Sequence, residues 1–558
     1  MRERIPLALL LAFAAPAQSP TPHARLEGIV IDPLERPVAN AAIAVERDGV
    51  VVATARSDGD GMFVCSRVPP RFLIVQVTTD APDAGAAPVD LWGEDRGFVR
   101  VRIGPARKLS GIVRDDGGEP IAGALVLTSP TGHGHHYAHC SDRTDADGHY
   151  ELTHVAMGSV TVRAWTDQHD CAAFSERIRA HGDETLDFSL ERDAGIWQTF
   201  VLENATPEQL ARAELRVLAF ATYQMPLPPE LMRPRAISPG RWEVRGWAST
   251  DSIGAWLELD GVTMYPCAQW IEGGVGTTTR RFQCGDADST ITGRLHRDDG
   301  EAAPGIALLV QPLAETQLTN AMRRVAISGA DGTFAVQAPV VDGDRFALRS
   351  LTPSSVVVGN DPSPAWFVET HDPERTWNLA IRDAESIRMR IETETGAPAP
   401  GVAIAIDIIE TDGQRTIGTG ISLLDGNVTI DGLGLSLPAT LAVSARGPAG
   451  EAAVAMRAGA TQRIDLGTIR LTPTATLDGE VLDDDGAAIP GAQVVISRHT
   501  GNRAEYLSTP ADRAGRFRIS GLEPGLYNAG VAGPLQPRFV TFRVVPGVTT
   551  KTTLRTSR

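Results

Sequence analysis

Apolar and polar residues alternate with a period of two in many short segments of the chain. Clear examples are 477–481, 492–496 and 517–519, in which every second position carries an apolar residue or glycine. In an extended strand this period places the apolar side chains on one face, so each segment is predicted to be a strand with one buried face. Asp-Gly and Pro-Gly clusters, which favour tight turns, separate these segments. The pattern therefore predicts an all-β chain built from short strands.

One motif recurs along the chain in two halves. The first half is a strand start followed by an acidic turn and a proline, and it begins at Gly28, Gly111, Gly293, Gly479 and, in a fainter copy, Met389. The second half is an Asp-Gly turn followed by a large or branched apolar residue, at Phe63, Tyr150, Phe334, Phe517 and Val428. A ring placed just after a hairpin can fill the centre of a small core. Regular short strands with such turn signals indicate β-sandwich modules.

The spacing of the copies divides the chain into modules. The first two starts lie 83 residues apart (28 to 111), and the steps from 111 to 293 and from 293 to 479 are each about two such units long. One unit without the motif therefore fills the gap before 293. We predict a leader at 1–17 and six modules at 24–104, 105–192, 193–288, 289–385, 386–472 and 473–558. We number them modules 1 to 6 and expect them to stand in a row with short linkers.

The repeated motif resembles the carboxypeptidase regulatory-like domain, a transthyretin-like or prealbumin-like seven-stranded sandwich. It also looks like the B-type repeats of bacterial collagen adhesins. The match covers four modules well and a fifth weakly. The resemblance implies a tandem array of about six Ig-like or transthyretin-like β-sandwiches on an exported bacterial protein, with an accessory or structural role. It carries over no catalytic residues, because the motif consists of turn and core positions.

The N-terminus predicts export from the cytoplasm. Two arginines near the start precede an apolar run at 5–15, and the tripeptide 15–17 (Ala-Pro-Ala) has the small-x-small pattern of a cleavage site. The mature chain is therefore expected to begin at Gln18 and to be secreted, periplasmic or held at the cell surface. No later stretch approaches the 18 apolar residues of a membrane-spanning helix, so no transmembrane segment is predicted.

Composition excludes some partners. The formal net charge is −17 and is spread along the chain. An acidic protein is repelled by nucleic acid and by anionic membranes, so neither is predicted as a partner. Glycine and proline together number 93 (55 and 38), which suits a fold with many turns.

The cysteines offer candidate disulfides, since export permits them. Cys267 and Cys284 lie close enough in sequence to join two strands of one module, and Cys140 and Cys171 could do the same in another. Cys65 is then left over. The alternative is that some or all are small buried apolar residues.

Module 2 is rich in histidine. Candidate metal ligands are His133, His135, His136 and His139, and imidazoles converging on one face could bind zinc, copper or iron. The alternative is a solvated, glycine-rich loop, because the spacing matches no closed zinc pattern. The Asp-x-Asp-Gly turns lack the further oxygens and bidentate glutamate of a calcium loop and are expected to be hairpin turns. No cofactor other than this metal is predicted.

Module 3 is rich in tryptophan and diverges from the motif. Trp242, Trp247 and Trp256 are candidate ligand-binding residues, because flat exposed rings suit stacking on sugars. If 241–247 is a strand, the first two rings fall on opposite faces, so one can be core and the other exposed or covered by a neighbouring module. The alternative is that both rings serve packing. A capping box at 206–209 predicts one short helix.

Three functions remain open. The first is a non-catalytic exported binding or scaffold protein of the bacterial envelope or exterior, with carbohydrate or other envelope proteins as partners. The second is a metal-binding protein or metal-dependent enzyme centred on module 2. The third is a purely structural stalk. No catalytic residues are predicted, since the chain has no Gly-x-Ser-x-Gly elbow, no His-Glu-x-x-His and no phosphate loop.

Overall fold

The structure is a computed structural model of the chain. It describes residues 23–555 apart from 48–49, 70–71, 92–95, 131–140, 158–159, 167–183, 193–195, 204, 222–224, 227–233, 247–249, 260–261, 273–278, 284–289, 313–323, 338–344, 353–354, 359–366, 371–375, 411–412, 434–438, 459–462, 501–502, 532–538 and 546. The described residues lie mostly in strands, which confirms the all-β class, and the strands fall into six successive groups. We keep the names modules 1 to 6 for these groups.

The first three modules span β1 to β22. Module 1 comprises β1 (Ala24–Ile31), β2 (Ala42–Arg47), β3 (Val50–Arg56), β4 (Met62–Val68), β5 (Phe72–Thr78), β6 (Asp83–Asp90) and β7 (Arg96–Arg102). Module 2 comprises β8 (Gly104–Asp115), β9 (Leu125–Pro130), β10 (Ser141–Arg143), β11 (His149–Ala156), β12 (Val160–Trp165), β13 (Glu184–Thr185) and β14 (Phe188–Leu190). Module 3 comprises β15 (Ile196–Glu203), α1 (Pro207–Arg212), β16 (Ala213–Ala221), β17 (Met225–Pro226), β18 (Arg235–Ser238), β19 (Arg241–Gly246), β20 (Thr250–Leu259), β21 (Val262–Glu272) and β22 (Thr279–Gln283).

The last three modules span β23 to β44. Module 4 comprises β23 (Thr290–His296), β24 (Ala307–Pro312), β25 (Arg324–Ile327), β26 (Thr333–Gln337), β27 (Arg345–Ser350), β28 (Ser355–Val357), β29 (Phe367–Thr370) and β30 (Trp377–Asp383). Module 5 comprises β31 (Glu385–Glu392), β32 (Ala403–Glu410), β33 (Gly413–Ile421), β34 (Asn427–Leu433), β35 (Ala439–Gly447), β36 (Gly450–Ala458) and β37 (Arg463–Arg470). Module 6 comprises β38 (Ala475–Leu482), β39 (Gln493–Thr500), β40 (Arg503–Pro510), β41 (Arg516–Leu522), β42 (Gly525–Val531), β43 (Val540–Val544) and β44 (Thr549–Arg555).

Every module begins with a strand that becomes the centre of its first sheet. This strand pairs antiparallel with a strand from the middle of the module and parallel with the last strand, as β38 does with β41 and β44. Module 3 lacks the sequence motif and still places β15 between β19 and β22 in the same way. A second sheet, such as β40-β39-β42-β43 in module 6, completes the sandwich around the apolar core.

The glycine and the aromatic residue of the motif face each other across the first ladder. In module 4 Gly293 pairs with Phe334, and a Cβ atom at Gly293 would lie 2.2 Å from the ring atom Cζ of Phe334. The ring therefore fills the space that a side chain on the first strand would need. Module 5 exchanges the sizes, since Met389 there pairs with Val428. A similar core volume is kept by moving the large residue to the other strand.

A buried hydroxyl links two turns in four modules. In module 4 the hydroxyl of Ser328 donates to Ala303 O (2.7 Å) and accepts from Ile306 N (2.9 Å), so both backbone groups have a partner. The same position holds Ser57, Thr144 and Ser422 in modules 1, 2 and 5, and Ala511 in module 6. The sequence signal for this link is the residue directly before the second turn of the motif.

Modules 1 and 2 share one continuous sheet. Strand β6 pairs with the start of β8 through Asp83 with Pro105 and Ala84 with Gly104, which gives the order β11-β8-β6-β5-β2-β3. The expected linker is absent at this described point, because β8 begins at Gly104, two residues after β7 ends. The two modules are therefore joined through backbone hydrogen bonds as well as through the chain.

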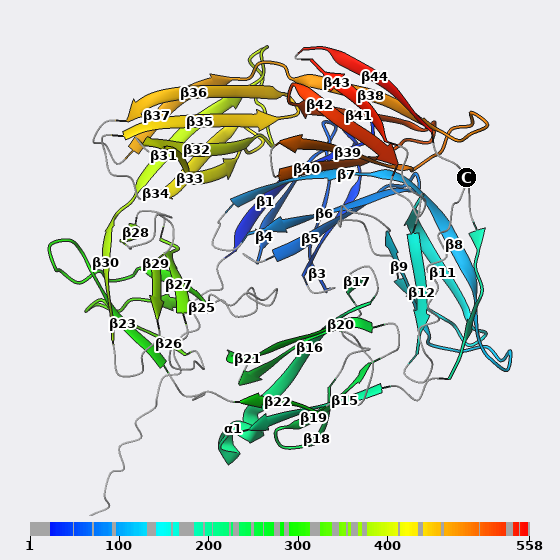
Figure 1. Ribbon diagram of the computed structural model, residues 1–558, viewed down its shortest axis with the longest axis horizontal. Helices are drawn as coiled ribbons and strands as arrows, with labels where there is room; N and C mark the ends of the chain where they lie inside the picture. Colours follow the sequence, from blue (N-terminus) through cyan, green and yellow to red (C-terminus); the bar gives the residue numbers. More distant parts are fainter. Residues whose placement is uncertain are drawn as a thin grey trace, which may run out of the picture.

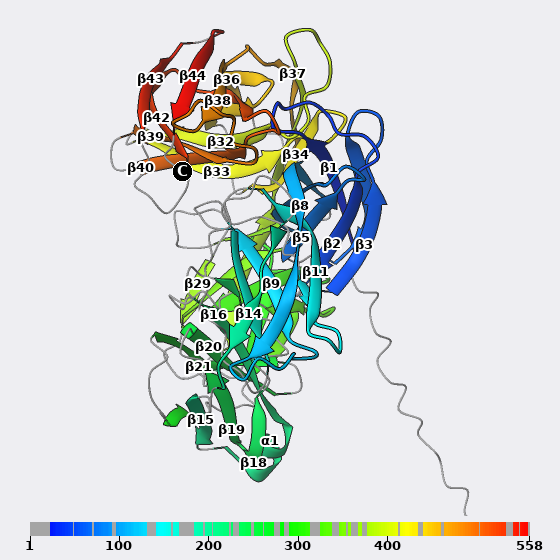
Figure 2. The same cartoon turned by 90° about the vertical axis from the view of Figure 1, so that its right-hand side faces the viewer.

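The modules follow one another round a loop instead of standing in the expected row. In Figure 1 the chain runs from module 1 (dark blue) through module 2 (cyan), module 3 (teal) and module 4 (green) to modules 5 and 6 (yellow to red), which return to module 1. The view in Figure 2 agrees, with modules 1, 5 and 6 together at one end and module 3 at the other. The tandem array of β-sandwich modules is confirmed, and contacts between the first and last modules draw its ends together.

Candidate functional site

The junction between module 1 and module 6 joins segments that lie more than 400 positions apart in the chain. A turn of module 1 at 32–36 lies against β41, the edge strand of its sheet in module 6. Arg518 N donates to Pro33 O (2.9 Å), and Ser520 N donates to Glu35 Oε1 (3.2 Å). Edge strands expose unpaired N–H groups that can recruit other chains, so module 1 covers an edge that would otherwise be open.

Arg102, at the end of β7, bridges both strands of module 6 that face module 1. Its guanidinium donates to Thr509 Oγ1 (3.0 Å) on β40 and to Arg518 O (3.0 Å) on β41. It also donates to Glu35 Oε1 at 2.9 Å, and the Glu35 side chain is only 11 % exposed. A planar guanidinium with several fixed donors suits a contact of this kind better than an ammonium group would.

Charges around Glu35 are balanced across the junction. Burial lowers the pKa of Arg100, the charge of Glu35 raises it and that of Arg102 lowers it further, with a net decrease. On the other side, the hydrogen bond to Asp478 raises the pKa of Arg518, and Arg518 Nε lies 2.7 Å from Asp478 Oδ1. The Glu35 carboxylate therefore stands among several arginines and offsets their mutual repulsion.

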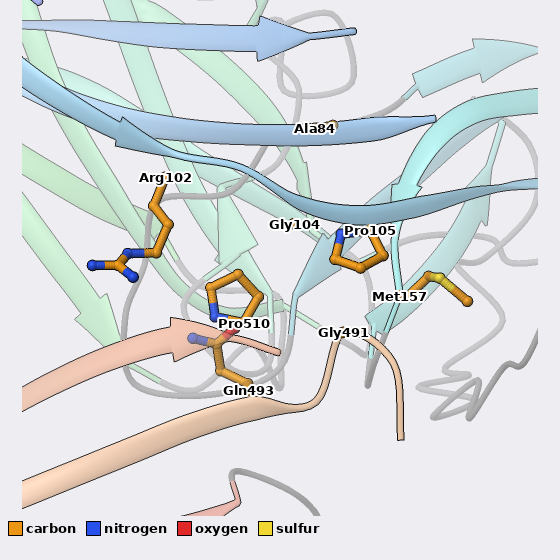
Figure 3. Close-up of a pocket in the computed structure, with 8 residues that line it drawn as sticks. All are labelled: Ala84, Arg102, Gly104, Pro105, Met157, Gly491, Gln493 and Pro510. Carbon is orange, nitrogen blue, oxygen red and sulfur yellow. The ribbon is translucent and has the colours of Figure 1, made fainter. Parts of the chain in front are cut away.

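A second set of contacts lies at the edge where modules 1, 2 and 6 meet. Figure 3 shows a crevice there with a volume of about 20 Å³, which is room for about one water molecule. A Cβ atom at Gly104 would lie 2.8 Å from Pro510 Cγ, and one at Gly491 would lie 2.4 Å from Met157 O. These close approaches identify the crevice as a packing joint and not as a pocket for a small molecule.

Module 5 also contacts module 1. Leu424 N donates to Glu27 Oε2 (3.1 Å), and a Cβ atom at Gly401 would lie 2.6 Å from Phe98 Cε1. Burial acts to raise the pKa of Asp425, but hydrogen bonds from Asn427 and the charge of Arg96 in module 1 lower it overall. Modules 5 and 6 are joined in turn by the ion pair of Arg446 with Glu523 (2.6 Å). The junction thus unites modules 1, 2, 5 and 6.

The predicted histidine site lies outside the described residues, since His133, His135, His136 and His139 all fall in 131–140. A different group is found beside it: oxygen or nitrogen atoms of Asp145, Asp147 and His149 lie within 4.8 Å of one another. All three residues are exposed, and Asp145 Oδ1 already accepts from the backbone N–H groups of the other two, each at 2.9 Å. This geometry is that of the expected hairpin turn.

The predicted disulfides involve positions that the structure leaves undescribed. Cys140, Cys171 and Cys284 lie outside the described residues, and Cys267 lies on β21. Cys65, the residue predicted to be left over, is a free cysteine buried in the core of module 1. Burial raises the pKa of its thiol. Both candidate pairs stay predictions.

The tryptophan candidates have different positions. Trp242 is 5 % exposed and lies in the interior of module 3, so its ring offers no free face for stacking. Trp256 lies on β20, opposite Arg216 of β16, and Trp247 falls outside the described residues. Trp197, on β15, is half-buried, and the guanidinium of Arg235 lies 4.9 Å from its ring centroid. The structure thus adds Trp197 to the candidates, because its ring is partly exposed.

Sequence reasoning missed the junction residues. Neither Glu35 nor Arg102 was singled out, and each has a partner in module 6 that lies more than 400 positions away in the chain. One signal was available for Glu35, because it occupies a turn position that holds glycine in other copies of the motif. No helix among the described residues is long and apolar enough to cross a membrane.

Comparison with known proteins bears on the modules individually. The family model of the carboxypeptidase regulatory-like domain matches residues 108–191 and 476–556, in modules 2 and 6. No curated protein matches the chain.

Among solved structures, a streptococcal ancillary pilin aligns at 12 % identity and a TM-score of 0.19, covering 48 % of this chain and 98 % of its own. The TIE protein of Bacillus anthracis aligns at 9 % identity and a TM-score of 0.15, covering 73 % and 71 %. The minor pilin GBS52 of Streptococcus agalactiae aligns at 14 % identity and a TM-score of 0.18, covering 31 % and 96 %. Likenesses this weak carry no argument about function. The family match confirms the resemblance seen in the repeated motif, and modules 2 and 6 are carboxypeptidase regulatory-like domains.

Proposed function

We propose that the protein is an exported, non-catalytic scaffold of the bacterial envelope or exterior, in which six modules form one closed frame that presents binding surfaces. The observation that carries this proposal is the junction, where Arg102 of module 1 bonds to β40 and β41 of module 6. A stalk gains length by keeping its modules apart, whereas these bonds draw the first and last modules together. The purely structural stalk is therefore disfavoured.

The recurring residues have structural tasks, which supports a non-catalytic role. Gly293 makes room for a ring, Ser328 links two turns, and Asp145 accepts N–H groups within its hairpin. These tasks account for the motif without any reaction. We also propose the division into modules at 104, 192, 288, 385 and 472 that the motif spacing predicts.

Carbohydrate is the ligand class that we propose for module 3, with other envelope proteins as the alternative partner. Trp197 is half-buried and has Arg235 over its ring, and Trp247 follows the same strand as the buried Trp242. An exposed aromatic ring can stack on a sugar while polar groups beside it bond to hydroxyl groups, and the polar groups here are Arg235 and the Glu243 carboxylate with which it pairs (2.5 Å). A glycan array with Trp197→Ala and Trp247→Ala as matched variants tests this, and equal binding by wild type and both variants would refute it.

Metal binding in module 2 is the second candidate function, because Asp145, Asp147 and His149 lie together and follow the histidine-rich segment in the sequence. The scaffold proposal expects a metal-free protein, in which Asp145 serves only its turn, whereas this second candidate expects one bound ion per chain. Elemental analysis of the wild type against a H135A/H136A variant tests this. Stoichiometric metal that is lost in the variant would overturn the scaffold proposal in favour of a metal site.

Small-angle X-ray scattering of the mature chain tests the closed frame directly. A module of about 90 residues is about 31 Å across, so six modules round a regular ring give a radius of gyration of about 33 Å, against about 54 Å for a straight row. The contact of module 5 with module 1 makes the frame no larger than the regular ring. A measured value near the first supports the proposal. A value near the second would show that the ends do not meet.

A further inference from the structure

The turn that module 1 offers to module 6 is built in the same way in five modules. In each, the N–H of the fourth residue donates to the carbonyl of the first, as Glu35 N does to Asp32 O (2.9 Å) and Gly118 N does to Asp115 O (3.0 Å). The fourth residue always has a positive φ: 62° at Glu35, 86° at Gly118, 83° at Gly300, 87° at Gly396 and 84° at Gly486. The backbone requirement is therefore the same throughout.

Only module 1 meets this requirement with a residue other than glycine among the five described turns. Positive φ suits glycine and is disfavoured by residues with a Cβ atom, and a glutamate gains none of the local bonds that help Asn or Asp there. Strained positions of this kind persist where the surroundings compensate for them. At Glu35 the compensation is visible, since its carboxylate accepts from Arg102 Nη2 and Ser520 N.

The other copies of the turn have no such surroundings. A Cβ atom at Gly118, Gly300 or Gly486 would find nothing within 4 Å. A glutamate there would keep the strain and would have no group of module 6 to accept from. Glu35 thus differs from the equivalent glycines because it contacts module 6, since the fold of module 1 itself does not require a glutamate at this position.

We infer that Glu35 is the residue that selects module 6 as the docking partner of module 1 and thereby closes the array. The docking surface is the turn 32–36, and the partner that fits it is an edge strand with outward N–H groups, which β41 supplies through Arg518 and Ser520. This inference rests on the closed frame proposed above and assigns the choice of module 6 as the partner to the Glu35 carboxylate.

The test is Glu35→Gly in the full mature chain. Glycine is the residue that modules 2, 4, 5 and 6 carry at this position, so module 1 should fold with it and lose strain. We expect the amides of Arg518 and Ser520 to exchange with solvent about tenfold faster, measured by hydrogen exchange and mass spectrometry on peptides within β41. The radius of gyration should rise, while amides of β1 and β4 stay as protected as in the wild type.

Two matched variants complete the design. Gly118→Glu places a glutamate at the same turn position in module 2, where the Arg114 guanidinium lies near it and no group of module 6 does, and should leave exchange in β41 and the radius of gyration unchanged. Glu35→Gln keeps the side-chain size and the strain but loses the charge, and should fall between the wild type and Glu35→Gly.

The outcomes separate this inference from the proposed function. A compact wild type together with an equally compact and equally protected Glu35→Gly would overturn the role of Glu35 and leave the closed frame standing. A Glu35→Gly dimer in which module 6 docks on a second copy would also overturn it, because the surface would then bind without the carboxylate. An extended wild type would overturn both.

Discussion

Module 6 lacks the hydroxyl that links two turns in modules 1, 2, 4 and 5, and adding one should stabilise it. In module 4 the hydroxyl of Ser328 bonds to Ala303 O and Ile306 N and is 4 % exposed. At the equivalent position Ala511 has no such group, and Ala492 N instead reaches Ile489 O at 3.4 Å, which is long for a hydrogen bond. The perturbation that we propose is therefore Ala511→Ser.

The magnitude follows from the two backbone groups involved. A serine at 511 would accept from Ala492 N and donate to Ile489 O, the geometry seen in the other modules. One net hydrogen bond contributes about 1 kcal/mol, and the replaced contact is weak, so Ala511→Ser should stabilise module 6 by about 1 kcal/mol. For a module of this size that corresponds to a rise in Tm of about 4–8 °C. The reverse change, Ser328→Ala, removes both bonds and should destabilise module 4 by about 2 kcal/mol.

Differential scanning calorimetry of the full chain measures both changes, and hydrogen exchange on peptides from each module assigns the transitions. The two variants serve as controls for each other, because they make the same exchange of atoms with opposite signs. A neutral or destabilising Ala511→Ser, together with a neutral Ser328→Ala, would refute the idea that the hydroxyl links the turns.

Three further predictions concern packing and the junction. Gly293→Ala should destabilise module 4 by about 2–3 kcal/mol, because the new Cβ atom would lie 2.2 Å from the Phe334 ring. Adding Phe334→Leu should recover part of this loss, as measured by urea titration. Additive effects of the two changes in the double variant would contradict the prediction. Arg102→Ala should weaken the junction by about 3 kcal/mol of free energy, because the buried Glu35 carboxylate loses its bond to Arg102. An unchanged radius of gyration together with unchanged amide exchange in β41 would contradict this. Lower pH should destabilise the turn of module 5 that contacts module 1, since burial acts to raise the pKa of Asp425 but hydrogen bonds from Asn427 and the charge of Arg96 lower it overall: the stabilisation is present above the unfolded value of about 3.9 and is lost as pH falls through the folded pKa. Exchange of the Asn427 amide, which donates to Asp425 Oδ1 (2.9 Å), from pH 7 to pH 3 measures this, and the pH dependence should weaken in Asp425→Asn; an equal pH dependence in wild type and variant would contradict the prediction.

Local elements of the fold could be predicted because their causes are local. The capping box placed α1 correctly: Gln209 N donates to Thr206 Oγ1 (3.2 Å) and Thr206 N donates to Gln209 Oε1 (2.7 Å). The period of two placed strands, and the aromatic residue after the turn packs on the first strand as expected. The hydroxyl that links the two turns was overlooked, although a serine or threonine stands directly before the second turn of the motif in four modules.

The candidate site could not be predicted, because its residues are neighbours only in space. Nothing in the sequence around Trp242 distinguishes a buried tryptophan from an exposed one. The pairing of β19 with β15 places its ring in the interior of module 3. The junction depends on partners such as Arg102 and Thr509, which no sequence spacing relates. The charge and the hydrophobic periodicity of the sequence predict the fold of each module but not which modules contact one another.

The sequence by itself determined the all-β class, the repeat and the turns, because alternating burial, glycine with positive φ and ring-filled cores act within one module. The tertiary structure alone decided that the array closes on itself and that modules 1 and 2 share a sheet. The physical reason is that closure depends on a few long-range hydrogen bonds and close contacts, such as those of Glu35, whose effect depends on the relative orientation of whole modules.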